Sequence, residues 1–368
     1  MKIAAICAYP AGLNAGMLSV DFSLDHMLHK IDPKIQLTKF NIERQVNIGT
    51  VDRPLNYEHL VNTSQLEQFD YILFWGDFLH WIDYANLDLV YRKKLKDEKI
   101  AKEAVIEQWF ELLLLEGKPD LQKKVLVFGT SLYGLNATQL SNQRYAKAIT
   151  SLYANAKHVQ MREIYSVNYL SQLIPSVNAR YGCDCSLFLD INQMGIDEPI
   201  VDAEPYIAYS LGRSGANSAI LALLNVIAAI SKKRLVNINW LDNSGVDGFR
   251  KKLSLLKGAD YVITDIYHMS INALREQKPT LCIGKGSDNV LTTLSDAKKQ
   301  LFFTQAFAAN YYIFLEKILD CLASDRKIQH LALHCIGLLN DRAANDFIFT
   351  MLGNQVSRSL SHMAKALD

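Results

Sequence analysis

Short apolar runs alternate with longer amphipathic stretches along almost the whole of this 368-residue chain. An apolar run of this kind is typical of a strand buried on both faces of a parallel sheet, and the amphipathic stretches have the period of helices that cover such a sheet. The alternation therefore predicts βαβ units and an α/β fold. Because the chain is too long for one ordinary domain, we expect two.

The first half of the chain carries the elements of a Rossmann-like domain over residues 1–180. We expect its strands at residues 2–7, 35–40, 70–75, 124–129 and 159–162. We expect its helices at residues 18–28, 101–116 and 142–155, with a further helix from Ser166.

The stretch from Pro175 to Glu204 is irregular and rich in turn-forming residues, so we place the domain junction there. A second Rossmann-like domain is predicted over residues 205–303. We expect its strands at residues 206–210, 235–240, 260–264 and 280–284, and its helices at residues 215–231, 246–257 and 269–277. Residues 304–368 are expected to be helices that pack back on the N-terminal domain. Two such domains facing each other across a ligand cleft would form a GT-B-like arrangement.

Charge and hydropathy exclude several classes of function. The chain has 39 Lys+Arg against 38 Asp+Glu, and a net charge of +1 gives no field for holding nucleic acid. No apolar run approaches the roughly 18 residues of a transmembrane helix, and the run Met1–Cys7 is too short for a signal peptide. The six cysteines form no CxxC pair. We therefore expect a cytoplasmic protein with free thiols and no integral membrane segment.

The segment Gly258–Ser270 brings polar side chains to the end of a buried strand. A polar turn containing Asp265 follows the strand, and a helix is expected to begin close to His268. A helix N-terminus disfavours the protonated imidazole, which suits proton transfer near neutral pH. A helix-capping or half-buried structural histidine would show the same pattern, and position alone does not separate the two interpretations.

Two loops of the second half could bind anions. In the first loop, Gly212 and Ser214 would let backbone N–H groups approach an anion, and Arg213 would add a guanidinium. A turn that needs glycine for a positive φ explains the same residues. In the second loop, Lys285 could contact a phosphate or a sugar, although a plain turn is equally consistent with the sequence.

The run GADYVITDIYHMSINALREQKPTLCIGKG resembles the most recognisable block of the polysaccharide pyruvyl transferase family. The shared positions are Thr264, Asp265, His268, Ala273, Leu274 and Pro279. The family has an arginine two residues before the histidine, and Ile266 stands there in this chain. In the family this arginine is expected to hold the anionic donor, so the chain would be a divergent member.

A second block, VQMREIYSVNYL, resembles the family's strand-Arg-Glu-x-x-Ser-helix element. It implies that Arg162 forms a fork for an anion in the cleft, whereas a local ion pair with Glu163 is the alternative. Fainter agreement surrounds Asn14 in the run NAGM, and Asp77 and Trp81 in the run DYILFWGDFLHW. The resemblance extends over residues 1 to about 300.

The resemblance implies transfer of a pyruvyl group from phosphoenolpyruvate to a sugar of a cell-surface glycan precursor, without a cofactor. The N-terminal domain would hold the acceptor and the second domain the donor. His268 would be the acid/base, with Asp265 orienting it. The donor would be bound by Arg162, Arg213, Lys285, Ser214 and Gly212, and the acceptor by Asn14 and Asp77. Trp81, near the end of a first-domain strand, could stack on an acceptor ring, and a place in the core is the alternative.

Two other functions stay open. The same architecture serves glycosyltransferases that use a nucleotide-sugar donor, and the departures at Met17, Asp77 and Ile266 would also fit a non-catalytic saccharide-binding protein. We expect no metal, because the sequence has no HxH, HExxH or DxD arrangement at a strand end, and His330 and His334 fit a solvent-facing helix pair. The acceptor sugar, an association with a lipid-linked glycan and the oligomeric state are left open.

Overall fold

The computed structural model describes residues 1–8, 14–50, 53–76, 78–96, 98–133, 135–196, 204–286 and 294–368. The chain divides into two compact units. The first unit contains residues 1–10, 20–189 and 356–368, and the second contains residues 11–19 and 190–355. Each unit is built on its own sheet of mainly parallel strands, so the predicted α/β fold is confirmed.

The sheet of the first unit has eight strands in the order β3-β4-β2-β1-β5-β6-β7-β8. Its neighbouring strands are parallel, except that β3 and β4 form an antiparallel pair. The strands are β1 (Lys2–Cys7), β2 (Gln36–Asn41), β3 (Val46–Thr50), β4 (Arg53–His59), β5 (Tyr71–Trp75), β6 (Val125–Thr130), β7 (His158–Met161) and β8 (Ala179–Tyr181). Every residue of β6 is buried, as the continuous apolar run predicted.

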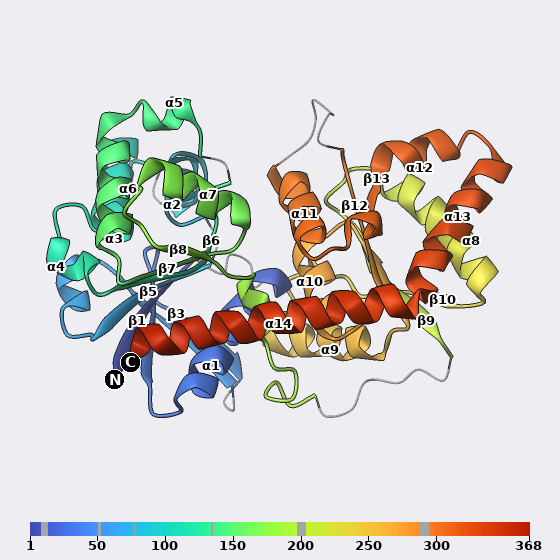
Figure 1. Cartoon of the computed structure of the whole chain (residues 1–368), viewed down its shortest axis with the longest axis horizontal. Coiled ribbons are helices and arrows are strands. Elements are labelled where there is room, and N and C mark those ends of the chain that lie inside the picture. The colour runs from blue at the N-terminus through green and yellow to red at the C-terminus, as the bar shows by residue number, and fades with distance from the viewer. Residues whose placement is uncertain are drawn as a thin grey trace. The chain divides into compact units, whose positions relative to one another are not determined.

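Helices cover both faces of this first sheet (Figure 1). The α-helices are α1 (Ala15–Ile31), α2 (Val90–Lys96), α3 (Lys102–Leu113), α4 (Pro119–Gln122), α5 (Ala137–Leu140), α6 (Gln143–Asn155) and α7 (Ile164–Leu173). The 3₁₀ turns are η2 (Thr63–Leu66) and η4 (Cys185–Phe188), and a π-helical turn is η3 (Tyr84–Leu89). The fully buried Trp75 fixes α1 against the sheet, because its Nε1 donates to the carbonyl of Val20 at 2.8 Å and its ring stacks on Phe128.

The sheet of the second unit has five parallel strands in the order β10-β9-β11-β12-β13. The strands are β9 (Tyr206–Ser210), β10 (Arg234–Asn237), β11 (Tyr261–Thr264), β12 (Thr280–Gly284) and β13 (Tyr312–Phe314). The helices are α8 (Asn217–Ser231), α9 (Gly245–Gly258), α10 (Tyr267–Arg275), α11 (Leu294–Gln305), η5 (Ala309–Tyr311), α12 (Leu315–Cys321), α13 (Asp325–Asn340) and α14 (Arg342–Leu367). Helices α8, α12 and α13 pack against one another (Figure 1).

The structure differs from the prediction for residues 304–368. Only residues 356–368 belong to the first unit, where Tyr71 Oη donates to the carbonyl of Leu367 at 3.4 Å. Residues 304–355 belong to the second unit, and they include β13, which extends its sheet. The strands β8 and β13 escaped prediction because an edge strand of three residues is too short to show a period. The β3–β4 pair was also not predicted.

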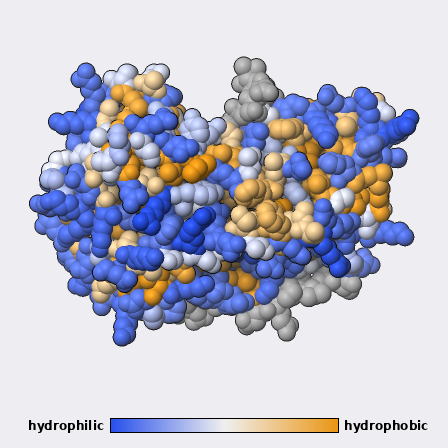
Figure 2. All heavy atoms as spheres, in the orientation of Figure 1, coloured by the Kyte–Doolittle hydropathy of each residue, from blue (hydrophilic) through white to orange (hydrophobic). Residues whose placement is uncertain are grey.

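None of the helices listed above is a candidate membrane span. None of the helices in the described part of the chain combines the length and apolar character needed to span a bilayer. On the face shown in Figure 2, hydrophilic residues are interspersed with hydrophobic patches.

Replacing Trp75 with alanine should destabilise the first unit by about 3–5 kcal/mol, because it removes a buried aromatic ring and leaves a cavity. Urea denaturation followed by circular dichroism measures the change. The matched control is Tyr91→Ala, since Tyr91 is 64% exposed and should change stability by no more than about 0.5 kcal/mol. Equal effects of the two variants would contradict the packing described for Trp75.

Candidate active site

The candidate site of the second unit is assembled at the carboxyl ends of two adjacent parallel strands. Ser210 at the end of β9 is in register with Thr264 at the end of β11. Thr264 Oγ1 donates to the Ser210 carbonyl at 2.7 Å and accepts the N–H of Ile266 at 3.1 Å. The loop after β9 and the turn after β11 therefore lie together at one edge of the sheet, where open α/β folds bind ligands.

The carboxylate of Asp265 is fully buried and is held by the loop after β9. It accepts the N–H groups of Gly212 at 3.0 Å, Arg213 at 2.9 Å and Ser214 at 2.7 Å. Gly212 has φ +149°, in the region that favours glycine, which lets the backbone curl round the carboxylate. Successive N–H groups of this kind form an anion-binding nest.

This nest corrects two predicted roles. The N–H groups of Gly212 and Ser214 were expected to bind an anionic ligand, but the chain's own Asp265 occupies them. Asp265 was expected to orient His268, and its hydrogen bonds instead fix the loop. The side chain of Arg213 is exposed, while its backbone is held in place by Asp265.

Lys299 supports the same turn from inside the unit. This lysine is completely buried, and its Nζ donates to the carbonyls of Asp265 and Ile283, each at 3.0 Å. It also pairs with Asp296 at 2.8 Å, which compensates the buried charge. Lys299 ties the turn after β11 to the end of β12, and only tertiary structure could assign it that place, because its sequence context is an ordinary amphipathic helix.

Cys282 lies in β12 beneath the same turn and is fully buried. Burial raises the pKa of its thiol to about 11. The thiol is therefore protonated at neutral pH and is not a nucleophile of the site.

His268 lies in the first turn of α10 and is half-buried. A Cβ placed on Gly16 would lie 2.6 Å from His268 Nδ1 and 3.1 Å from Asn14 Oδ1, so the three residues surround one point. Asn14 Oδ1 accepts the N–H of Gly16 at 2.8 Å, and the Asn14 carbonyl accepts that of Leu18 at 3.0 Å. The imidazole thus lies beside the N-terminus of α1. Residues 14–19 belong to the second unit, as His268 does.

The contact between His268 and Gly16 was not predicted. The sequence singled out Asn14 and His268 separately, one for the acceptor and the other for proton transfer. The available signal was the glycine two residues after Asn14, since a glycine inside a helix costs stability and often marks a close approach.

Two further residues lie at the carboxyl edge of the sheet, Ile266 after β11 and Lys285 after β12. Ile266 is 5% exposed and precedes α10 in extended conformation, so an apolar side chain packs where the resemblance expects a donor-binding arginine. Lys285 follows β12 and is half-buried, and its carbonyl accepts Tyr312 Oη at 3.0 Å. The backbone of Lys285 is therefore fixed at the carboxyl end of that strand.

Arg162, in the first unit, is not placed as an anion-binding fork. It is 8% exposed, and its guanidinium lies 3.4 Å from Glu163 Oε2, 3.7 Å from Asp184 Oδ2 and 5.2 Å from the ring of Phe78. Glu163 also accepts the hydroxyl of Ser131 at 2.7 Å. The structure therefore corrects the prediction in favour of a local ion pair, because two carboxylates already balance this charge.

The other acceptor residues were predicted in the first unit. Asp77 lies outside the described residues. Trp81 is half-buried, and its ring centroid is 5.7 Å from that of Phe78. Its indole Nε1 is buried without a hydrogen-bond partner in the described part of the chain. Buried indole N–H groups usually have a partner, so this donor is one that a bound polar group could satisfy.

No group of three or more His, Cys, Asp or Glu side chains among the described residues has an arrangement that could hold a metal ion.

Asp265→Ala should lower the free energy of unfolding of the second unit by about 3 kcal/mol or more, because it leaves three N–H donors without their acceptor. Chemical denaturation measures the loss, and limited proteolysis should detect cleavage in the released loop. Asp247→Ala is the control, since the Asp247 side chain is 75% exposed and its ion pair contributes little. A stable Asp265→Ala protein with an uncut loop would show that the nest does not hold the loop.

The fold has relatives among solved structures. A Listeria monocytogenes protein assigned as a UDP-N-acetylglucosamine 2-epimerase is similar with a TM-score of 0.51 and 10% identity, over 98% of this chain and 95% of that one. Another UDP-N-acetylglucosamine 2-epimerase gives a TM-score of 0.50, 10% identity and the same coverage. At this identity the likeness shows the fold alone. UGT2 of Phytolacca americana gives a TM-score of 0.47 and 10% identity over 100% of both chains.

No curated protein matches the chain. The model of the family described as polysaccharide pyruvyl transferase matches residues 105–287, about half of the chain. This segment contains both blocks on which the resemblance was recognised, those around Arg162 and His268. The match confirms that resemblance, and it places the chain with the polysaccharide pyruvyl transferases, among transferases that act on saccharides.

Proposed function

We propose that this protein transfers a pyruvyl group from phosphoenolpyruvate to a sugar of a cell-surface glycan precursor. The observation that carries the proposal is the placement of His268 in the family-matched segment, half-buried at the start of α10 and beside the start of α1. This is an imidazole at the carboxyl edge of a parallel sheet, with the guanidinium of Arg213 on a loop at that same edge.

The reaction needs an acid, a base and cations. Two hydroxyl oxygens of the sugar form bonds to C2 of the enolpyruvyl group, and the bond from C2 to the phosphate oxygen breaks. The methylene carbon gains one proton and becomes a methyl group. The second hydroxyl proton leaves with the phosphate, so a pyruvate ketal and inorganic phosphate are the products. Cationic groups stabilise the carboxylate and the departing phosphate.

His268 is the group proposed to move these protons. Arg213, on the loop fixed by Asp265, is proposed to bind the donor anion, with Lys285 at the end of β12 as a second cation. Asn14, at the start of α1, is proposed to contact the acceptor. Asp265 acts in this scheme as a positioning residue, because its carboxylate sets the loop that carries Arg213.

One observation favours a second donor. The apolar Ile266 removes the arginine that the resemblance associates with phosphoenolpyruvate. A nucleotide-sugar donor is therefore the alternative, and a non-catalytic saccharide-binding protein is the outcome if neither donor binds.

Thermal-shift measurements with phosphoenolpyruvate, UDP-N-acetylglucosamine and a CMP-linked sugar test the donor. A ligand that binds only the folded state should raise the melting temperature. Phosphoenolpyruvate is expected to do so, and Arg213→Gln should reduce the shift. If only a nucleotide sugar stabilises the protein, the donor is a nucleotide sugar and not phosphoenolpyruvate. If none of the three ligands stabilises it, the transferase proposal is contradicted.

His268→Ala should lower kcat of the pyruvyl transfer about 10²–10⁴-fold, because it removes the proposed acid/base. The melting temperature should change little, since the side chain is half-exposed. His29→Ala, at an exposed position near the end of α1, is the matched control and should keep its activity. If the His268→Ala variant turned over as fast as the unaltered protein, the imidazole would not be the acid/base of the reaction.

Gly16→Ala should displace the imidazole, because the added Cβ would lie 2.6 Å from His268 Nδ1. We expect a loss of at least about tenfold in kcat, the scale on which misplacement of a reacting group is felt. Gly353→Ala in α14 is the control, since its added Cβ would have no neighbour within 4 Å. Equal activities of the two variants would show that the contact does not position His268.

A further inference from the structure

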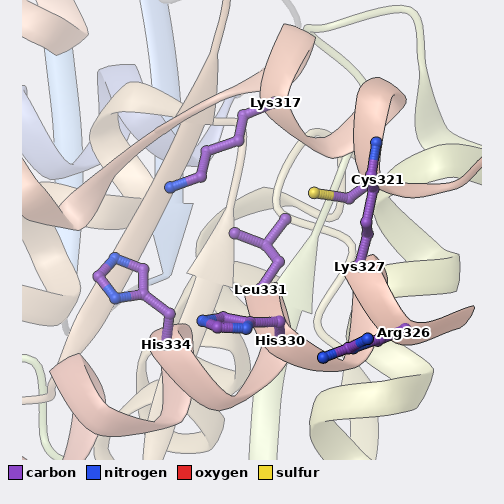
Figure 3. A pocket seen from close by; sticks show the side chains of 7 residues that line it. All are labelled: Lys317, Cys321, Arg326, Lys327, His330, Leu331 and His334. Atoms are coloured by element: carbon purple, nitrogen blue, oxygen red, sulfur yellow. The ribbon is translucent and has the colours of Figure 1, made fainter. Parts of the chain in front are cut away.

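A cavity of about 460 Å³ lies between α12 and α13 in the second unit, which we call the α12–α13 pocket (Figure 3). Its lining residues are Lys317, Cys321, Arg326, Lys327, His330, Leu331 and His334. None of them has a part in the proposed transfer. The volume lies within the range of small-molecule sites.

Helical spacing brings the residues of this lining to one side of each helix. Lys317 and Cys321 are one turn apart on α12, and Lys327, His330 and His334 follow one another by about a turn on α13. In Figure 3 the ammonium of Lys317 extends from α12 toward His334, and the Cys321 sulfur projects into the space between the helices. His330 and His334 were predicted to be a solvent-facing pair, and both are exposed as predicted, while they also line the cavity.

The lining contains three cations and two imidazoles and no carboxylate. Among the described residues, none of these five side chains makes an ion pair with an acidic group. Arg326 and Lys327 also lie in the first turn of α13, where the helix dipole is already positive. These side chains are exposed, and Asp325 lies in the same first turn but does not line the cavity. A bound anion would lower the repulsion among the three cations of the lining.

A metal does not explain the cluster. In the described part of the chain, Cys321, His330 and His334 do not form an arrangement that could hold a metal ion. The neighbouring Lys317 and Lys327 would in addition repel a cation.

We propose that the α12–α13 pocket binds the phosphate group of a soluble small molecule, either inorganic phosphate or a phosphate monoester. A phosphate carries about two negative charges at neutral pH and offers several acceptor oxygens, which suits a lining that has cationic donors on both α12 and α13. The side chain of Leu331 provides an apolar wall for an attached organic group. This inference does not depend on the pyruvyl transferase proposal, because it uses other residues and is measured by binding.

Isothermal titration calorimetry at constant ionic strength tests the site with inorganic phosphate, glucose 1-phosphate, glucose, and phosphatidylcholine vesicles containing phosphatidic acid. At least one soluble phosphate should bind, and glucose should not. The relative affinities of phosphate and glucose 1-phosphate identify the source of the phosphate group. Binding by the vesicles alone, or by none of the probes, would overturn the proposal.

The double variant Lys317→Gln/Lys327→Gln should weaken phosphate binding at least tenfold. The matched control is Lys251→Gln, an exposed lysine of α9 in the same unit that does not line the pocket, and it should bind as the unaltered protein does. Circular dichroism checks that both variants are folded. Equal binding by the double variant and the control would place the phosphate elsewhere and overturn the proposal.

Cys321 supplies an independent measurement. It is the half-buried cysteine of the chain, and Cys7, Cys183, Cys185, Cys282 and Cys335 are buried. The neutral reagent N-ethylmaleimide should therefore alkylate Cys321 first in the native protein, as peptide mass spectrometry can verify. Saturating phosphate should slow this alkylation at least threefold relative to chloride at the same ionic strength. An unchanged rate would show that phosphate does not occupy the pocket.

Discussion

The second unit depends on one buried carboxylate and the backbone that encloses it. Asp265 accepts three consecutive N–H groups of the loop after β9, while Lys299 holds the Asp265 carbonyl from inside. A buried charge without such partners would cost several kcal/mol, so the loop cannot leave the turn freely. The same interactions fix the backbone of Arg213 and the turn from which α10 begins. The loop that carries the proposed donor cation therefore depends on Asp265, whose carboxylate is bonded to the protein's own backbone.

Close packing at the start of α1 supplies the other half of the site. There is no room for a side chain at position 16. Because Gly16 has no Cβ, the imidazole of His268 can lie beside Asn14. In the first unit the family-like Arg162 is neutralised by Glu163 and Asp184 and serves packing. The two residues of the same sequence resemblance differ in their surroundings. Arg162 lies beside two carboxylates, and His268 lies beside the start of α1.

The net charge of the chain does not reveal where its charged side chains cluster. The net charge of +1 excludes a general electrostatic partner, yet the turn between α12 and α13 gathers lysine, arginine and histidine side chains around one cavity. These residues are spread over about eighteen positions of the sequence, and helical spacing places them around the same cavity. A concentration of charge on this scale is a property of the fold and selects small anions.

The alternation of strands and helices was predictable from the residue pattern, because a strand buried on both faces needs a continuous apolar run and a helix buried on one face needs helical periodicity. The sequence also located the polar turn around Asp265 and His268, since strand ends of parallel sheets meet at one edge. Tertiary structure alone decided that Asp265 fills the nest predicted for a ligand, that Gly16 abuts His268, and that residues 304–355 complete the second unit. These depend on contacts between residues far apart in the chain, which no local pattern of residues encodes.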